Sequence, residues 1–270
     1  MKLRYIYILT ALFFALPFIG NAKELKIITF NIRSFEPDFN TQPYAELLWN
    51  ENPDVVCLNE VENRSSRQQI DGKYRDVVQD LANRMHLFGL FGYSYNLSNK
   101  DGKNPEENYK YCENELYGNA ILSKYPILNV STIQLPRPTG SADQRGVVIA
   151  DILLPEGKII RVACTHLDHV GGQLEQATVL TSDEVKSNTY PTILCGDMNV
   201  GPNSDVIKKL LTVYDRLDND SGTYLGLSKI DFILGTKGKW ELKSCKVLDR
   251  HLNGKELSDH CPVVSVVKLK

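Results

Sequence analysis

The 270-residue chain is close to charge balance, with 31 Lys and Arg against 33 Asp and Glu and a formal charge of −2. This balance excludes a protein that holds nucleic acid through a broadly basic surface, although a small basic rim remains open. The length suits one large α/β domain, and no low-complexity linker or charge run divides the chain.

The first 22 residues have the pattern of a secretory signal peptide. Lys2 and Arg4 precede a nearly continuous apolar run, and Gly20 and Ala22 place small residues at the −3 and −1 positions of a cleavage site. We therefore expect residues 1–22 to be removed and the protein to be exported, either to a periplasm or to the medium.

A membrane anchor is the alternative for this segment. The apolar run is short for a membrane span, however, and Pro17 interrupts it. The expected mature chain is a single catalytic domain over residues 23–270, with no transmembrane segment left after cleavage. Loss of the two N-terminal cations would leave 29 basic and 33 acidic side chains, a formal charge of −4.

Six cysteines in an exported chain raise the question of disulfides. Cys57, Cys164 and Cys195 lie inside apolar strand patterns, where cysteine behaves as a small core residue. Cys112 and Cys245 lie in less regular sequence and are better candidates for pairing. The spacing does not fix the connectivity.

The pattern of apolar residues predicts alternating strands and helices. In chain order, we expect a strand over 25–33, a helix over 41–53, a strand over 53–63, a helix over 75–85, a polar loop over 98–108, a strand and turn over 118–127, strands over 146–154 and 159–169, a helix over 172–185, a strand over 191–200, a helix capped by Ser204 over 204–211, and strands over 228–235 and 260–269. So many strands would all be buried if two mixed sheets packed face to face with helices outside, as an α/β/β/α sandwich.

Two of these strands share a form. Residues 53–63 and 190–200 each contain a proline, an apolar run, a cysteine and then an acid where the strand ends. Asp197 and Asn199 follow the second run, two positions apart, so their side chains point the same way in a strand-like segment. A turn is the ordinary explanation for Gly-Asp-Met-Asn, and only the rest of the chain argues for more.

Polar side chains recur at the ends of the expected apolar strands. They are Asn31, Glu60, His166, Asp168, Asp197, Asn199, Asp231, Asp259 and His260. Because buried carboxylates require partners or a metal, so many at strand ends indicate a shared site.

The motifs that carry these residues resemble those of the endonuclease/exonuclease/phosphatase superfamily. They are, in family order, TFNIR, CLNEVEN, YGNAILSKYPI, DQRGVV, CTHLDH, CGDMN, KIDFIL and LSDHCPV, from residue 29 to 263. Each motif is weak alone, but all eight in order form a specific signal. The one departure is LNE at 58–60, where the family usually has LQE.

The resemblance implies hydrolysis of a phosphoester with bound Mg²⁺ or Mn²⁺. Glu60 matches the principal metal ligand of the family, and Asn31 and Asp259 would complete or support that site. Such hard cations prefer oxygen ligands and keep several waters.

The resemblance also implies the acid–base groups. His260 matches the general base, and Asp231 matches the carboxylate that orients its ring. Asp197 and Asn199 match the pair that holds the nucleophile and the phosphoryl oxygens.

Four further residues have two explanations each. His166 matches a second histidine that would donate a hydrogen bond or a proton to the phosphate or leaving group, and Glu115 would orient it or be a solvated surface acid. Arg145 would contact a phosphate oxygen or form a surface ion pair. Asp168 would be a second metal site or substrate clamp, or would form a hydrogen-bonded turn.

The substrate class is the least determined feature of the sequence. We expect a phosphodiester in a nucleic acid, a small molecule or a lipid headgroup, with a phosphomonoester of a sugar or inositol and a non-catalytic binding module as alternatives. The acidic mature chain weakens a general nuclease, the lack of a long apolar hairpin weakens a lipid enzyme, and the lack of a Lys/Arg cluster weakens a polyphosphate phosphatase. No obligate protein partner is evident.

Overall fold

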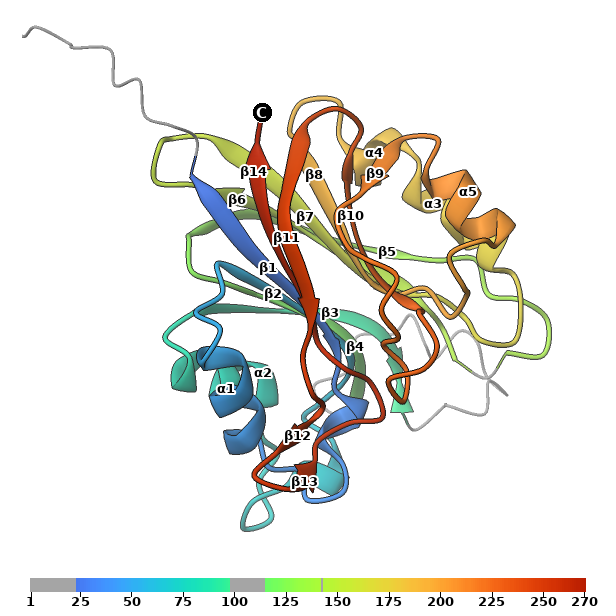
Figure 1. Cartoon of the computed structure of the whole chain (residues 1–270). Helices are drawn as coiled ribbons and strands as arrows, with labels where there is room; N and C mark the ends of the chain where they lie inside the picture. Colours follow the sequence, from blue (N-terminus) through green and yellow to red (C-terminus); the bar gives the residue numbers. More distant parts are fainter. Residues whose placement is uncertain (1–22, 98–114, 142) are drawn as a thin grey trace, which may run out of the picture.

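The computed structural model describes residues 23–97, 115–141 and 143–270, and within them two six-stranded sheets face each other (Figure 1). The first sheet has the order β11 (Trp240–Val247), β14 (Val263–Leu269), β1 (Glu24–Asn31), β2 (Val55–Asn63), β4 (Leu116–Ser123) and β3 (Phe88–Asn96). The second has the order β5 (Ile127–Gln134), β6 (Gly146–Leu153), β7 (Ile159–His166), β8 (Thr192–Asp197), β10 (Asp231–Thr236) and β9 (Tyr214–Arg216). A hairpin of β12 (His251–Leu252) and β13 (Lys255–Glu256) is separate.

Helices cover both outer faces of the pair of sheets (Figure 1). The helices are α1 (Gln42–Trp49) and α2 (Val77–Arg84) on the first sheet, and α3 (Gln173–Leu180), α4 (Asp183–Lys186) and α5 (Asp205–Leu210) on the second. Short 3₁₀ turns lie at Arg33–Phe35 and Ser66–Gln68. Each sheet is mixed, because β1 and β2 are parallel in one and β7 and β8 in the other. The expected four-layer sandwich is confirmed.

Three apolar clusters fill the spaces between these layers. The central cluster joins the inner faces of the two sheets and includes Ile27, Val148 and Ile193. The second lies under α1 and α2, and the third lies under α3 and α5. Burial of one face of each helix and both faces of each central strand is what holds the layers together.

Within the two six-stranded sheets, the strands missed by the sequence analysis lie at the edges; the short hairpin strands β12 and β13 were missed as well. The missed edge strands are β3, β5, β9 and β11. Most residues of β5 and β11 are exposed, so neither has the buried apolar run that identifies a central strand. Edge strands need only one partner and tolerate polar side chains on both faces.

The helix expected over 172–185 is two helices, which corrects the prediction. α3 ends at Leu180, and Ser182 adopts an extended conformation (φ −70°, ψ 159°) before α4 begins at Asp183. Serine favours such a position because its hydroxyl competes for backbone groups in a helix interior. Ser204 does cap α5 as expected, since its Oγ accepts from Ile207 N at 3.2 Å.

The five described cysteines are all free, and Cys57, Cys164 and Cys195 are buried core residues as expected. Cys245 is among the free ones. The other candidate for pairing, Cys112, the signal segment 1–22 and the polar loop at 98–108 lie outside the described residues. Among the described residues, no helix is both long enough and apolar enough to span a bilayer.

Candidate active site

Residues from both sheets meet at one end of the sandwich. Asn31 ends β1, His166 ends β7, Asp197 ends β8 and Asp231 begins β10. In the second sheet His166 lies opposite Asp197, and Asp197 lies opposite Asp231. The strand register of the second sheet therefore brings His166, Asp197 and Asp231 together. Asn31 reaches Asp197 from the first sheet, although Asn31 and Asp231 are 200 residues apart in the sequence.

Two local irregularities shape this end of the sandwich. The register of β2 against β4 shifts between Leu58 and Val61, and within this bulge Glu60 has a positive φ of 55°. Bulges re-aim side chains, and here one directs Glu60 toward Asn31. Gly196 lets β7 and β8 approach, because a Cβ there would lie 1.8 Å from the carbonyl oxygen of Thr165.

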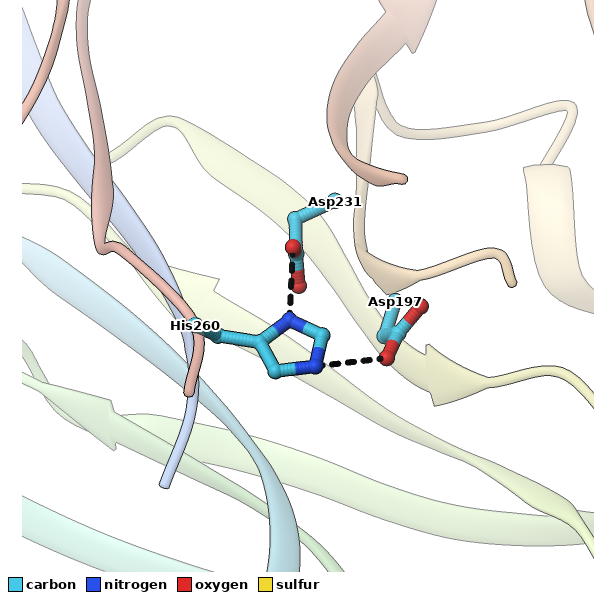
Figure 2. Close-up of side chains that lie close together, drawn as sticks. All are labelled: Asp197, Asp231 and His260. Atoms are coloured by element: carbon cyan, nitrogen blue, oxygen red, sulfur yellow. Dashed lines mark hydrogen bonds and ion pairs between the residues drawn. The ribbon is translucent and has the colours of Figure 1, made fainter. Parts of the chain in front are cut away.

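His260 is held between two carboxylates (Figure 2). Its Nδ1 lies 2.9 Å from Asp231 Oδ2, and its Nε2 lies 3.6 Å from Asp197 Oδ2. Burial acts to lower the pKa of His260, but the charge and hydrogen bond of Asp231 outweigh it, and the pKa is raised to about 9. An oriented imidazole with one nitrogen free toward the site is the arrangement of a general base.

Asp197 is the buried centre of the site. Its Oδ2 accepts from Asn31 Nδ2 at 3.1 Å, and its Oδ1 accepts from the backbone N–H of Asn199 at 2.9 Å. Burial raises the pKa of Asp197 to about 7, and the nearby charge of Asp231 adds to that rise, which His260 opposes. A carboxylate that can gain or lose a proton near neutral pH therefore faces His260.

His166 lies on the other side of Asp197, with Nε2 3.5 Å from Asp197 Oδ2. Arg145 Nη1 is 3.1 Å from its Nδ1, and Asn199 Nδ2 is 2.9 Å from its Nε2. Because Arg145 can only donate, Nδ1 of a neutral ring accepts from it, and the single ring proton lies on Nε2, beside Asn199 and Asp197. Burial, and after it the charge of Arg145, holds the pKa of His166 well below its usual value. Of the two expected roles, this neutral ring suits hydrogen bonding rather than proton donation.

Arg145 is buried and already engaged. Its Nη2 lies 3.3 Å from His169 Nδ1 and 3.5 Å from Asp143 Oδ2, and its Nη1 contacts His166. Its Nε has no hydrogen-bond partner among the described residues. The expected contact with phosphate would have to use this crowded guanidinium, and the expected surface ion pair is wrong because the side chain is 5% exposed.

Glu115 and Asp168 are held by contacts other than those considered for a catalytic role. Glu115 Oε1 accepts from the backbone N–H of Ser66 at 2.9 Å, and Arg145 occupies the position beside His166 that Glu115 was expected to fill. Asp168 Oδ1 accepts from Val170 N at 2.7 Å and its Oδ2 accepts from Ser141 Oγ. Asp168 therefore forms the hydrogen-bonded turn that was its alternative explanation.

The three residues expected to bind metal lie together. Asn31 Nδ2 donates to Glu60 Oε1 at 2.8 Å, and Asp259 is close enough for its charge to act on Glu60. Burial raises the pKa of Glu60, which the amide of Asn31 only partly offsets. No described donor reaches Glu60 Oε2, and Asp259 Oδ1 has only Ser258 Oγ at 3.4 Å. Two weakly compensated carboxylates fit a hard divalent cation, which would supply the missing positive charge.

Potential ligand atoms of Asp197, Asp231 and His260 also lie within 4.8 Å of one another. The geometry of this group suits a hydrogen-bonded acid–base set better than a metal, because Nδ1 of His260 is already paired with Asp231. The Glu60 side of the site, with oxygen donors alone, is the better match for Mg²⁺ or Mn²⁺.

Two structural contributors were not predicted as site residues. The fully buried Asn59 donates to the carbonyl of Thr165 at 2.7 Å and accepts from Asp197 N at 3.0 Å, so it ties the two sheets together beneath the site. Ser258 Oγ donates to Asn31 O at 2.7 Å and accepts from His260 N at 3.1 Å. In the sequence, Asn59 could have been noticed as an amide inside an apolar strand, at the position where LNE departs from the LQE of the family.

Comparison with known proteins agrees with this geometry. The family model described as "Endonuclease/Exonuclease/phosphatase family" matches residues 28–260. The chain belongs to this family. A search of curated protein sequences gives no match.

Several solved structures have the same fold as this chain. The endonuclease/exonuclease/phosphatase from Bacteroides vulgatus is 21% identical with a TM-score of 0.69, and covers 92% of this chain and 100% of its own. The catalytic domain of human Nocturnin, solved with sulfate, is 17% identical with a TM-score of 0.68, and the match covers 92% of this chain and 94% of the Nocturnin chain. The mannosyl-6-phosphatase of Bacteroides thetaiotaomicron is 18% identical with a TM-score of 0.64, and the match covers 91% of this chain and 99% of the phosphatase chain. At these identities the likeness establishes the fold alone.

Proposed function

We propose that this family member is an exported, divalent-metal-dependent hydrolase that cleaves a phosphodiester. The observation that carries the proposal is His260, oriented by Asp231 at 2.9 Å with its second nitrogen facing Asp197. Family membership supports a hydrolase acting on phosphoesters. A non-catalytic module would have no need to keep a buried His–Asp pair, which costs desolvation energy.

The proton path follows from this geometry. Nδ1–H of His260 donates to Asp231, so Nε2 is the basic nitrogen and takes the proton of the attacking water. Asp231 stabilises the resulting imidazolium. Asp197 lies beside Nε2 and is fixed by Asn31 and Asn199, so it can hold the water in line with the phosphorus.

Charge on the phosphate is handled by the rest of the site. Mg²⁺ or Mn²⁺ would be held by Glu60, Asn31 and Asp259, and when bound would neutralise a phosphoryl oxygen. His166, neutral and in contact with Asn199, would donate a hydrogen bond on the same side as Asp197. These groups stabilise charge that develops in the transition state.

The panel of substrates that tests this proposal is bis(p-nitrophenyl) phosphate, p-nitrophenyl phosphate and plasmid DNA, each with Mg²⁺, Mn²⁺ or EDTA. We expect metal-dependent cleavage of the diester, reduced by about 10³-fold or more in His260→Ala and Asp197→Ala because the base or its partner is lost. His251→Ala is a matched control, since His251 is a partly exposed histidine in the β12 hairpin. Near wild-type rates in His260→Ala would refute the mechanism, and preference for the monoester would make the protein a phosphomonoesterase.

Export is the second part of the proposal. It is supported by the basic start, apolar run and small residues of segment 1–22. Cell fractionation with N-terminal sequencing tests it, and we expect a mature chain that begins at Lys23. An uncleaved protein in the cytosol would contradict export without affecting the catalytic proposal.

A further inference from the structure

A short turn beside the candidate base exposes three large apolar side chains. In this apolar turn (Tyr224–Leu227), Tyr224 is 37% exposed, Leu225 is 45% exposed and Leu227 is 82% exposed. Single exposed apolar residues are common, but three within four positions form a patch that needs an explanation.

The backbone of the apolar turn is well fixed. Leu227 N donates to Tyr224 O at 2.9 Å, and Tyr224 N donates to Ser228 O at 2.8 Å. Leu225 N donates to the carbonyl of Asp259 at 2.7 Å, which ties the turn to the segment that carries His260. The apolar side chains are therefore presented in a defined position.

The turn carries a leucine where its conformation disfavours one. Leu225 (φ 51°) and Gly226 (φ 71°) are the two central residues, and both are left-handed, as in a type I′ turn. Asn, Asp or Gly is the usual residue at the position of Leu225. Leu225 stays nearly half exposed, so burial in this chain does not offset the strain of a left-handed leucine. Backbone strain of this kind is retained mainly at functional positions.

The patch is continuous with the candidate active site. The ring of Tyr224 lies 5.1 Å from the ring of His260, at an interplanar angle of 61°. Tyr224 and His260 are also bridged through their backbones. A phosphoester with its phosphorus near His260 would therefore extend one of its substituents over the apolar turn.

Charges around the turn argue against a polyanionic substrate. Lys229 Nζ lies 3.0 Å from Asp218 Oδ2, and Arg216 pairs with Asp218 at 2.7 Å and with Asp220. The cations on the segments before and after the turn are thus neutralised by their own chain. A nucleic-acid backbone would therefore gain little electrostatic attraction at the turn, whereas binding of an uncharged apolar group does not depend on unpaired cations.

We propose that the apolar turn binds the apolar part of a single substrate molecule, a phosphodiester with an acyl- or alkyl-bearing alcohol. Leu225 and Leu227 would pack against the chain and Tyr224 against the segment next to the phosphate. This inference rests on the proposed phosphodiesterase function and adds the class of alcohol that the site selects.

The test compares two diesters with the same phosphate and headgroup, dihexanoylphosphatidylcholine below its critical micelle concentration and glycerophosphocholine. We expect the wild-type protein to prefer the acylated compound in kcat/KM. Leu227→Ser should lower that preference about tenfold, because the apolar contact that Leu227 would make with the bound acyl chain is lost. Leu225→Asn should lower it as well while raising the Tm, since asparagine suits a left-handed turn. The rise in Tm separates loss of preference from loss of folding.

Leu128→Ser is the matched control, because Leu128 is 46% exposed at the start of edge strand β5. It should leave the preference unchanged. An unchanged preference in both turn variants would overturn the proposal. So would an effect confined to phosphatidylcholine vesicles, which would indicate docking on a lipid surface, or an effect on an oligothymidylate alone, which would indicate base stacking.

A binding measurement keeps the inference testable if no diester is cleaved and the proposed function fails. Saturation-transfer NMR of dihexanoylphosphatidylcholine in EDTA should show transfer from the protein to the acyl protons. Leu227→Ser should reduce that transfer and Leu128→Ser should not. Equal transfer in wild type and Leu227→Ser, or transfer to headgroup protons alone, would refute the apolar contact.

Discussion

The two histidines on either side of Asp197 differ in the charge of their nearest partner. His260 has the Asp231 carboxylate at Nδ1, and its pKa is raised to about 9. His166 has the Arg145 guanidinium at Nδ1, and its pKa lies well below the usual value. Both rings are buried, so burial alone does not account for the difference.

The charge of the partner at Nδ1 therefore distinguishes the protonation chemistry of the two buried rings. The Asp231 anion makes Nε2 of His260 more basic and stabilises the imidazolium that forms when the ring takes a proton. Burial, and after it the Arg145 cation, keeps His166 neutral, which leaves it a hydrogen-bonding group. One site thus obtains two chemically different imidazoles from the same residue type.

Among the substitutions that test this comparison, loss of the Asp231 carboxylate should have the largest effect on activity. We expect Asp231→Asn to lower kcat at least about a hundredfold, because His260 loses its orientation and the charge that stabilises its imidazolium. In the metal-free protein the pKa of His260 should fall from about 9, since burial, which lowers it, would remain. Activity assays and NMR titration of the imidazole signals measure both.

Asp151→Asn is the control for this change, because Asp151 is also buried and pairs with Arg161 at 2.8 Å. It should cost stability and leave kcat nearly unchanged. If Asp231→Asn kept the wild-type kcat, the His–Asp pair would have no part in catalysis.

Loss of the Arg145 guanidinium should have an intermediate effect on activity. Arg145→Gln should raise the pKa of His166 toward its usual value, because the positive charge is lost while burial remains. We expect kcat to fall about tenfold as His166 loses its fixed position. NMR titration of His166 is the decisive readout, since a purely structural change would not move that pKa upward.

Arg161→Gln provides a matched loss of an ion-paired arginine far along β7 from His166. Its effect on the His166 signal should be negligible. A His166 pKa that stayed low in Arg145→Gln would show that burial alone sets it.

The smallest effect is expected at Asp168, the acid that lies 3.9 Å from Arg145 Nε. Asp168→Asn should change activity and Mg²⁺ affinity by less than about threefold, because the asparagine oxygen can accept from Val170 N as the carboxylate does. Metal titration with an activity assay measures both quantities. A tenfold loss of Mg²⁺ affinity would instead make Asp168 part of a second metal site.

The central strands could be predicted from the sequence and the edge strands could not. β1, β2, β7 and β8 are buried on both faces, so their apolar runs are visible in the sequence. β5 and β11 are largely exposed, and their sequences resemble loops. Their strand character comes from hydrogen bonding to β6 and β14, which no local pattern reveals.

The candidate site divides in the same way. Asn31, Asp197 and Asp231 were recognisable because each stands at the boundary of an apolar strand. The pairing of His166 with Arg145 rather than Glu115 was not, because it depends on contacts between β7 and the segment before β6. The apolar turn was also missed, because exposure of its leucines is a tertiary property.

By itself, the sequence determined which residues form the central strands and which polar residues stand at their ends, because burial and strand periodicity act locally along the chain. Only the tertiary structure decided the partners of those polar residues. The close approach of β7 and β8 at Gly196, a bulge at Glu60 and the buried Asn59 bring distant segments together. Charge at each histidine follows from that arrangement, since electrostatic effects depend on distance in space rather than separation in sequence.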